Sequence, residues 1–200
     1  MNPEDVGRSY DLIAHRWDGD AFPRENGVAQ HERAIAFTRL RGPALDIGCG
    51  SSGRFMDLLL THGFLPEGLD VSGTMLDLAR RRHPDRVFHH ADICSWQFPH
   101  AFDFISAWDS IWHVPLHAQE GVLAKMLRGL SPGGVAVFTM GGTEGPSETT
   151  NAYMGPRMYH GTIGIPRTLE LIVETDSICR HLEYDQYPEL HVYIICQRKA

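Results

Sequence analysis

The chain has 200 residues, of which 42% are apolar and 22% charged, and its formal net charge is −7. This size and composition suit one globular domain with its own hydrophobic core. No apolar run approaches the ~20 residues that a membrane-spanning helix needs. Residues 1–10 carry acids where a signal peptide would carry basic residues, so we expect a cytoplasmic protein with no membrane partner.

The distribution of charged and metal-binding side chains argues against a nucleic-acid-binding protein and against a metalloprotein. Proteins that bind DNA or RNA need clustered basic residues to neutralise phosphates, whereas the cluster at residues 80–82 fits the last turn of a helix. The four cysteines are scattered, and His113 and His117 flank Pro115 without a further ligand nearby. We therefore expect neither a nucleic-acid partner nor a metal site.

Short apolar runs alternate with helical patterns along most of the chain. We expect strands at 44–47, 67–70, 87–90, 102–107 and 135–140, with helices at 54–62, 72–82 and 117–130 between them. Pro166 suits the start of a last helix, and the runs 179–187 and 191–197 suit an antiparallel hairpin joined by 188–190. The predicted fold is a doubly wound α/β domain whose mostly parallel seven-stranded sheet is closed by an antiparallel C-terminal hairpin.

The pattern predicts a single domain, residues 1–200, made of four parts. Residues 1–41 are helical, residues 42–140 hold the strongest motifs, and residues 166–200 form the last helix and the hairpin. Residues 141–165 are rich in Gly, Pro, Ser and Thr and too long for a plain connection, so we expect a substrate loop. Its Tyr159 and His160 would line a substrate pocket or, equally, pack within the loop itself.

The strongest local motif is the glycine-rich turn of residues 44–55, which joins an expected strand to an expected helix. Glycines at 48, 50 and 53 let a ligand approach the backbone, and the helix N-terminus offers unpaired N–H groups. Taken alone, Gly48-x-Gly50-x-x-Gly53 fits a dinucleotide fingerprint equally well.

Three acids at the ends of successive strands narrow the choice of ligand. Asp46 would repel a pyrophosphate but suits the ammonium group of a bound amino acid. Asp70 can accept hydrogen bonds from both hydroxyls of a ribose, and Asp92 can receive an adenine amino group while Ile93 packs on the ring. Each acid could instead cap a turn or helix. Asp103, early in its strand, is interpreted as structural.

Together these features resemble the class I S-adenosylmethionine-dependent methyltransferases of the small-molecule type, which also carry a Pro-Gly-Gly, here residues 132–134, before the fifth strand. Residues 9–18 are similar to the N-terminal helix that many members fold over the cofactor. The resemblance implies S-adenosylmethionine as cofactor, a small-molecule methyl acceptor and a lid at residues 1–41. It also implies a set of cofactor-binding residues: Tyr10, Trp17, Asp46, Gly48, Gly50, Gly53, Asp70, Val71, Met75, Asp92, Ile93, Ala107 and Trp108.

The sequence departs from the family pattern in two places. Members usually read Gly-x-Gly-x-Gly, whereas Gly50 and Gly53 here flank Ser51 and Ser52, which leaves open which of the last three residues contacts the cofactor. Members that methylate amide or nucleobase nitrogens usually carry Asn/Asp-Pro-Pro-aromatic after the fourth strand. This chain has Trp108-Asp109-Ser110 there, so that chemistry is not expected.

Methyl transfer is an in-line attack on an activated methyl group, and a base is needed only when the nucleophile holds its proton tightly, as a hydroxyl does. His113 is the expected catalytic base by position and pKa range, although it could instead pack or cap the loop. Trp112 is expected at the substrate pocket or in the core. The alternatives are an NAD(P)-dependent oxidoreductase, which Asp46 disfavours, and a non-catalytic S-adenosylmethionine-binding protein. The acceptor and the oligomeric state stay open.

Overall fold

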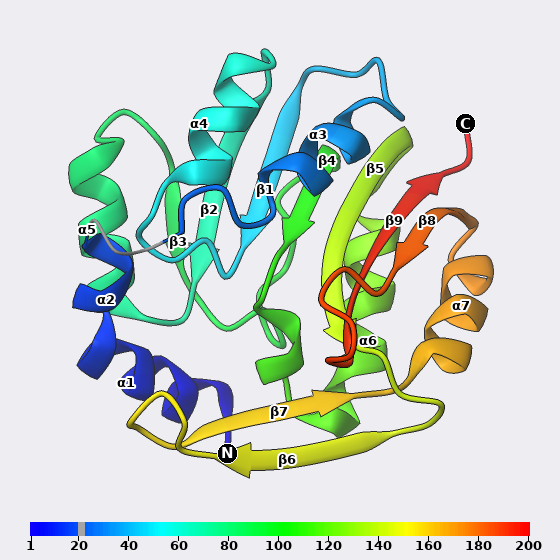
Figure 1. Cartoon of the computed structure of the whole chain (residues 1–200). Coiled ribbons are helices and arrows are strands. Elements are labelled where there is room, and N and C mark those ends of the chain that lie inside the picture. The colour runs from blue at the N-terminus through cyan, green and yellow to red at the C-terminus, as the bar shows by residue number, and fades with distance from the viewer. Residues whose placement is uncertain (20–22) are drawn as a thin grey trace.

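A seven-stranded sheet forms the centre of the computed structural model, which describes residues 1–19 and 23–200 (Figure 1). Residues 20–22 of the predicted lid lie outside the described residues. The strand order is β3-β2-β1-β4-β5-β9-β8. The strands are β1 Pro43–Ile47, β2 Leu65–Asp70, β3 Phe88–His90, β4 Phe102–Ala107, β5 Leu130–Gly141, β8 Ser177–Glu183 and β9 His191–Arg198. Strands β1 to β5 pair in parallel and β9 runs antiparallel to β5 and β8, which confirms the predicted sheet.

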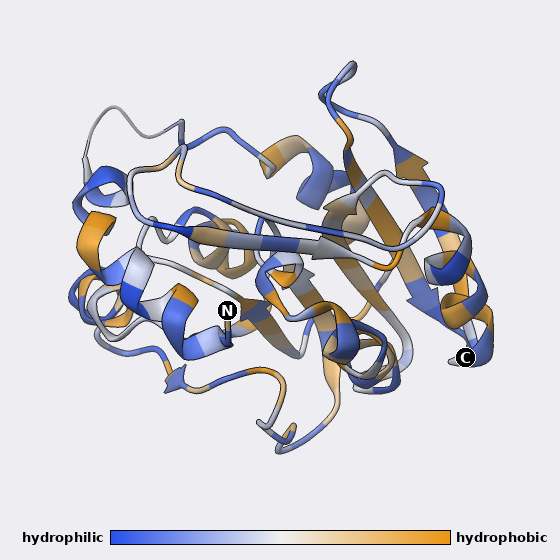
Figure 2. Ribbon diagram, turned by 90° about the horizontal axis from the view of Figure 1, so that it is seen from below, coloured by the Kyte–Doolittle hydropathy of each residue, from blue (hydrophilic) through white to orange (hydrophobic). Residues whose placement is uncertain are grey.

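Most of the helices cover the two faces of this sheet (Figure 1). The helices are α1 Pro3–Ile13, α2 His15–Asp18, α3 Val28–Ile35, α4 Arg54–Thr61, α5 Gly73–Arg82, α6 Leu116–Arg128 and α7 Ile165–Glu174, with a short 3₁₀ turn, η1, at Ile111–His113. In β1, Ala44 packs with the apolar residues of α3 and α4, whereas Leu45 and Ile47 pack with those of α6 and α7. Because successive side chains of a strand point to opposite faces, burial on both faces produces the apolar runs seen in the sequence (Figure 2).

The predicted helix boundaries follow from recognisable end signals. Ser72 caps α5 by accepting a hydrogen bond from the Met75 N–H, and the basic residues at 80–82 occupy its last turn. Pro166 lies in the first turn of α7, where its missing N–H costs no helical hydrogen bond. Asn2 and Asp5 form a capping box at the start of α1.

The structure differs from the sequence prediction in residues 141–165. This segment contains an antiparallel hairpin of β6 (Ser147–Asn151) and β7 (Met158–Thr162) instead of a loop. Strand β6 is polar and largely exposed, so it shows no apolar alternation, and burial of Met158 and Tyr159 against the rest of the molecule holds β7 in place. The C-terminal hairpin also differs in its link, because β8 ends at Glu183 and the connection spans residues 184–190.

Helix α1 and the β6–β7 hairpin lie together along the carboxyl ends of the parallel strands, and Figure 2 looks onto this edge (Figures 1 and 2). Val6 and Ile13 of α1 form a small apolar cluster with Met158 and Tyr159, apart from the two main core clusters. The Ser9 Oγ donates a hydrogen bond to the Arg157 carbonyl at 2.8 Å. The N-terminal segment and the hairpin therefore form a joint cover over this edge. Within the described ranges, no helix is long and apolar enough to cross a bilayer.

Candidate active site

A cavity opens at the carboxyl ends of β1 and β4, where the strand order reverses, which is the place where doubly wound sheets bind ligands. It encloses about 980 Å³, part of it open to solvent, at the upper end of the ~300–1,000 Å³ found for small-molecule pockets. Most of the predicted cofactor residues line it: Tyr10, Trp17, Gly48, Gly50, Asp70, Val71, Met75, Asp92, Ile93 and Trp108. The fold thus collects residues from six segments around one space.

Three predicted cofactor residues do not line the cavity. Gly53 precedes α4 with φ +70°, and a Cβ there would lie 2.6 Å from the His83 ring, so glycine is needed for backbone geometry. Ala107 is fully buried in the core, and Asp46 is buried behind the cavity wall.

The glycine-rich turn is fixed from two sides. The N–H groups of Gly48 and Cys49 both donate to the Leu69 carbonyl, at 2.7 and 3.1 Å. A Cβ on Gly48 would lie 2.3 Å from the Cβ of Ser110, so only glycine fits there. Ser51 and Ser52, between Gly50 and Gly53, line the cavity, and within the described residues the buried Ser51 Oγ has no hydrogen-bond partner.

Asp70 links the turn to the next helix while facing the cavity. Its two carboxylate oxygens accept hydrogen bonds from the N–H groups of Gly50 and Ser72, both at 2.8 Å. Each oxygen keeps a second lone pair for a ligand. Burial raises the pKa of this carboxyl group. Asp92 borders the cavity beyond β3, where it accepts a hydrogen bond from the Cys94 N–H at 2.8 Å.

A buried polar chain that the sequence reading missed lies behind the cavity. His31 of α3 donates from Nδ1 to the Gly27 carbonyl at 2.7 Å, and its Nε2 meets the Ser106 Oγ at 2.7 Å. Burial lowers the pKa of His31 to about 3, so its ring is neutral. Burial raises the pKa of Asp46 to about 7, against the opposing effect of the Ser106 hydroxyl and the Arg54 guanidinium. The only sequence signal for His31 was its place in an otherwise amphipathic helix.

Arg54, the first residue of α4, also lines the cavity. Its Nε donates to the Asn26 carbonyl at 2.9 Å and its Nη1 to the Ser52 Oγ at 2.8 Å, with the guanidinium 4.1 Å from the centre of the Phe55 ring. Among the described residues, this is the one Arg or Lys side chain at the cavity wall, so it supplies a positive charge beside the glycine-rich turn.

His113, the predicted catalytic base, lines the cavity from η1. Its Nδ1 meets the Tyr159 carbonyl at 2.6 Å, and because a carbonyl only accepts, Nδ1 carries the proton. Nε2 then accepts a hydrogen bond from the Tyr10 hydroxyl at 2.8 Å. Burial lowers the pKa of His113 to about 4, below the ~6.5 expected from an unperturbed histidine. The ring is neutral and ties α1 to the β6–β7 hairpin.

A second hollow, which we call the hairpin cleft, lies beside the β6–β7 hairpin and has a volume of about 990 Å³, much of it open to solvent. Of the predicted substrate residues, Trp112 and His160 line it, whereas Tyr159 lines neither hollow. The Tyr159 hydroxyl donates to Glu148 at 2.7 Å and accepts from the Leu116 N–H at 2.9 Å, so Tyr159 holds the hairpin against α6. The full lining is Trp112, Gly141, Ser147, Glu148, Thr149, His160, Gly161, Thr162, Glu189, Leu190 and His191.

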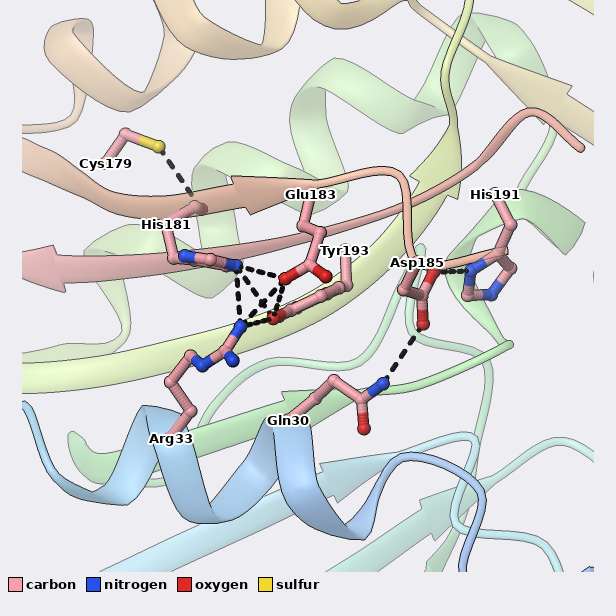
Figure 3. Close-up of polar contacts among 8 residues, drawn as sticks. All are labelled: Gln30, Arg33, Cys179, His181, Glu183, Asp185, His191 and Tyr193. Carbon is pink, nitrogen blue, oxygen red and sulfur yellow. Dashed lines mark hydrogen bonds and ion pairs between the residues drawn. The ribbon is translucent and has the colours of Figure 1, made fainter. Parts of the chain in front are cut away.

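Two polar networks connect α3 to the C-terminal hairpin (Figure 3). In one, Arg33 lies within 2.8 Å of Glu183 and also contacts Tyr193 at the outer end of the sheet. In the other, Gln30 donates to Asp185, which contacts His191. In the described part of the chain, these networks included, no group of three or more His, Cys, Asp or Glu side chains is placed to hold a metal ion.

Comparison with known proteins shows what the chain is similar to. Residues 44–134 match the family model for a methyltransferase domain. Among solved structures, the fold is shared with a complex of DhpI and SAH (TM-score 0.71, 22% identity, 98% of this chain and 96% of that one). It is also shared with an S-adenosylmethionine-dependent methyltransferase from Clostridium acetobutylicum ATCC 824 (TM-score 0.72, 12% identity, 96% and 99%). These matches agree with the resemblance to class I methyltransferases, in sequence over residues 44–134 and in fold over nearly the whole chain.

Curated relatives with named substrates match this chain over only part of their length. A trans-aconitate 2-methyltransferase from Acidovorax ebreus (strain TPSY) is 36% identical over 134 residues, covering 63% of this chain and 50% of the relative. A dTDP-3-amino-3,6-dideoxy-alpha-D-glucopyranose N,N-dimethyltransferase from Streptomyces fradiae is 30% identical over 139 residues, covering 66% and 52%. The chain spans about half the length of these relatives.

Proposed function

We propose that this protein transfers the methyl group of S-adenosylmethionine to a small-molecule acceptor. The observation that carries the proposal is the cavity at the reversal of strand order, which gathers the glycine-rich turn, Asp70 and the Asp92–Ile93 pair. The methyltransferase domain at residues 44–134 supports this function over that of a nicotinamide-dependent oxidoreductase.

The residues present fit this cofactor. The remaining lone pairs of Asp70 suit the two ribose hydroxyls, and Asp92 with Ile93 suits the adenine ring, as in the sequence reading. Arg54, together with Ser51 and Ser52, offers donors for the carboxylate of the methionine part. Asp46 lies behind the wall, so its effect on the ammonium group would be electrostatic and not a direct contact.

The cofactor, when bound, supplies an activated methyl group on a sulfonium sulfur. The protein then has to align the acceptor with that methyl group and exclude water. Pro3, Val6 and Tyr10 of α1 and Trp17 of α2 form one wall of the cavity. We therefore propose that residues 1–41 act as the lid and that the hairpin segment 141–165 contributes to the acceptor site. The cytoplasmic location and the absence of nucleic-acid and membrane partners stay predictions.

Substitution of Asp70 tests the proposed site. Loss of two hydrogen bonds to a carboxylate should weaken binding of S-adenosylhomocysteine to Asp70→Ala by roughly 30- to 1,000-fold, measured by titration calorimetry. Asp77→Asn, which alters an exposed carboxylate on α5, is the matched control and should bind like wild type. Unchanged affinity in Asp70→Ala would contradict the ribose assignment, whereas a wild-type protein that binds no S-adenosylhomocysteine would overturn the proposed function.

A further inference from the structure

Asp109, directly after β4 and Trp108, has an unusual backbone conformation. Its φ is +52°, a left-handed value that residues other than glycine rarely adopt and that Asp and Asn tolerate best. Its N–H donates to the Thr139 Oγ1 at 2.8 Å, and the Asn26 Nδ2 contacts its Oδ2 at 3.3 Å. The side chain is 33% exposed and lines the cavity, so this geometry presents a carboxylate to the ligand space.

The other carboxylate oxygen of Asp109 contacts His191, which in turn pairs with Asp185. The His191 Nε2 lies 3.0 Å from the Asp109 Oδ1, and the His191 Nδ1 lies 2.5 Å from the Asp185 Oδ1. Asp185 also accepts a hydrogen bond from the Gln30 Nε2 at 3.2 Å (Figure 3). The side chains of His191 and Asp185 are 9% and 8% exposed, so these two members of the chain are largely sheltered from water, whereas Asp109 faces the cavity.

Two carboxylates favour the charged form of the imidazole between them. Burial lowers the pKa of His191, but its hydrogen bonds with Asp109 and Asp185 outweigh burial, so the pKa is raised. The further titratable groups at this place are His160, Glu148 and Glu189, which line the hairpin cleft together with His191. A charged imidazole donates to both carboxylates at once, which fixes the orientation of Asp109.

This chain lies in the wall between the cavity and the hairpin cleft. Asp109 and His113 line the cavity, whereas His191 and His160 line the cleft. The rings of His113 and His160 are 4.9 Å apart between centroids, so the wall is two side chains thick at that point. His191 therefore contacts Asp109 from the side opposite the cavity.

We propose that the methyl acceptor is an amine and that its nitrogen hydrogen-bonds to Asp109 within the cavity. The inference rests on the proposed function and adds the substrate class. Asp70 and Asp92 already have partners in the cofactor, which leaves Asp109 as the cavity carboxylate for the acceptor. A carboxylate acceptor would be repelled by Asp109. A hydroxyl acceptor would need a base. His113 does not suit that role, because its Nε2 accepts a hydrogen bond from Tyr10 and is weakly basic.

The reaction needs no further reagent. The lone pair of the free amine forms the nitrogen–carbon bond as the sulfur–carbon bond breaks, and the sulfur keeps that electron pair as a neutral thioether. Positive charge passes from sulfur to nitrogen, where the Asp109 carboxylate stabilises it as it develops. The ammonium product retains its proton until it leaves to solvent. Asp109 is thus the catalytic residue, and His191, held by Asp185, is its positioning residue.

Sinefungin provides a test that needs no known acceptor, because it carries a C–NH₃⁺ group where S-adenosylmethionine carries S–CH₃. Wild type should bind sinefungin about tenfold or more tighter than S-adenosylhomocysteine, since a charge-assisted hydrogen bond to Asp109 forms only with the amine. Asp109→Asn, which tolerates the left-handed backbone, should lose this preference and still bind S-adenosylhomocysteine. Asp92→Asn, the matched control on the cavity wall, should weaken both ligands alike and keep the preference.

Each other outcome overturns the inference. An unchanged preference in Asp109→Asn would place Asp109 away from the transferred methyl group, and equal loss of both ligands would assign it to the cofactor's own ammonium group. Binding of neither ligand to wild type would instead overturn the proposed function.

A final check uses three acceptors that share one ring: cyclohexylamine, cyclohexanol and cyclohexanecarboxylate. Methylation of the alcohol or the carboxylate, but not of the amine, would contradict the substrate class.

The role of His191 has its own readout. Histidine Cε1–H resonances, with that of His191 identified by its loss in His191→Gln, should titrate above the ordinary histidine pKa in wild type. The same resonance should shift to a lower pKa in both Asp109→Asn and Asp185→Asn, because each variant removes one flanking charge. A His191 pKa that ignores either substitution would show that the three side chains do not act together.

Discussion

At the scale of single residues, backbone and side-chain geometry work together at the ends of β1 and β4. Gly48 leaves room for Ser110, and the Ser110 Oγ donates to the Ile47 carbonyl at 2.8 Å, so the two loops fix each other. His113 then joins the cover to this frame through Tyr10 and the Tyr159 carbonyl. A small number of buried polar contacts therefore determines the shape of the cavity.

The buried His113 predicts a pH dependence of stability. Its pKa of about 4 in the folded protein is below the ordinary histidine value of 6.5. The unfolded chain therefore binds more protons between these values, and stability falls as pH falls through this window. Between pH 7.5 and pH 5, wild type should lose about 2 kcal/mol more unfolding free energy than His113→Gln, measured by urea denaturation. Equal losses in the two proteins would show that His113 is not buried in its neutral form.

At the scale of elements, the cover over the cavity joins segments that are far apart in sequence. Asp11 of α1 accepts hydrogen bonds from the Ser72 Oγ at 2.6 Å and the Thr74 N–H at 3.0 Å, at the start of α5. The Arg16 Nη1 donates to the Met154 carbonyl at 2.9 Å, between the two hairpin strands. These contacts lie outside the main core, so the cover is expected to open without global unfolding.

Removal of residues 1–18 tests whether this cover is a lid. Because its apolar cluster is separate from the main core, the deletion should lower affinity for S-adenosylhomocysteine by about tenfold or more and lower the melting temperature by only a few degrees. Asp11→Ala should have a smaller effect in the same direction, and Leu12→Ala, at an exposed position of α1, is its control. Unchanged affinity after deletion would contradict the lid, and failure to fold would show that the segment is core.

The sequence predicted those elements whose stability comes from local and periodic signals. β1 and β4 are buried on both faces, so each is a continuous apolar run that indicates a strand. α5 has Ser72 at its start and basic residues at its end, which mark the two ends of a helix. The β6–β7 hairpin was missed because its polar strands depend on packing against α1 and α6. Asp109 was noticed as part of a motif, but its left-handed backbone and its pairing with His191 arise only when β4 and β9 meet across β5.

At the scale of the whole molecule, the cavity at the carboxyl ends of β1 and β4 should bind S-adenosylmethionine and not a dinucleotide. The match of residues 44–134 to the family model for a methyltransferase domain supports S-adenosylmethionine, whereas the glycine-rich turn alone would also suit NAD. A ligand that binds only the folded state stabilises it by about 2.7 kcal/mol at a hundred times its dissociation constant. For a chain of this size, that corresponds to a rise of roughly 5–10 °C in melting temperature.

The most direct measurement of the central claim is therefore a thermal unfolding scan of the wild-type protein with S-adenosylhomocysteine and, separately, with NAD. We expect a concentration-dependent rise in melting temperature with S-adenosylhomocysteine, which Asp70→Ala should largely abolish, and no rise with NAD. A rise with NAD alone, or no response to S-adenosylhomocysteine at millimolar concentration, would contradict it.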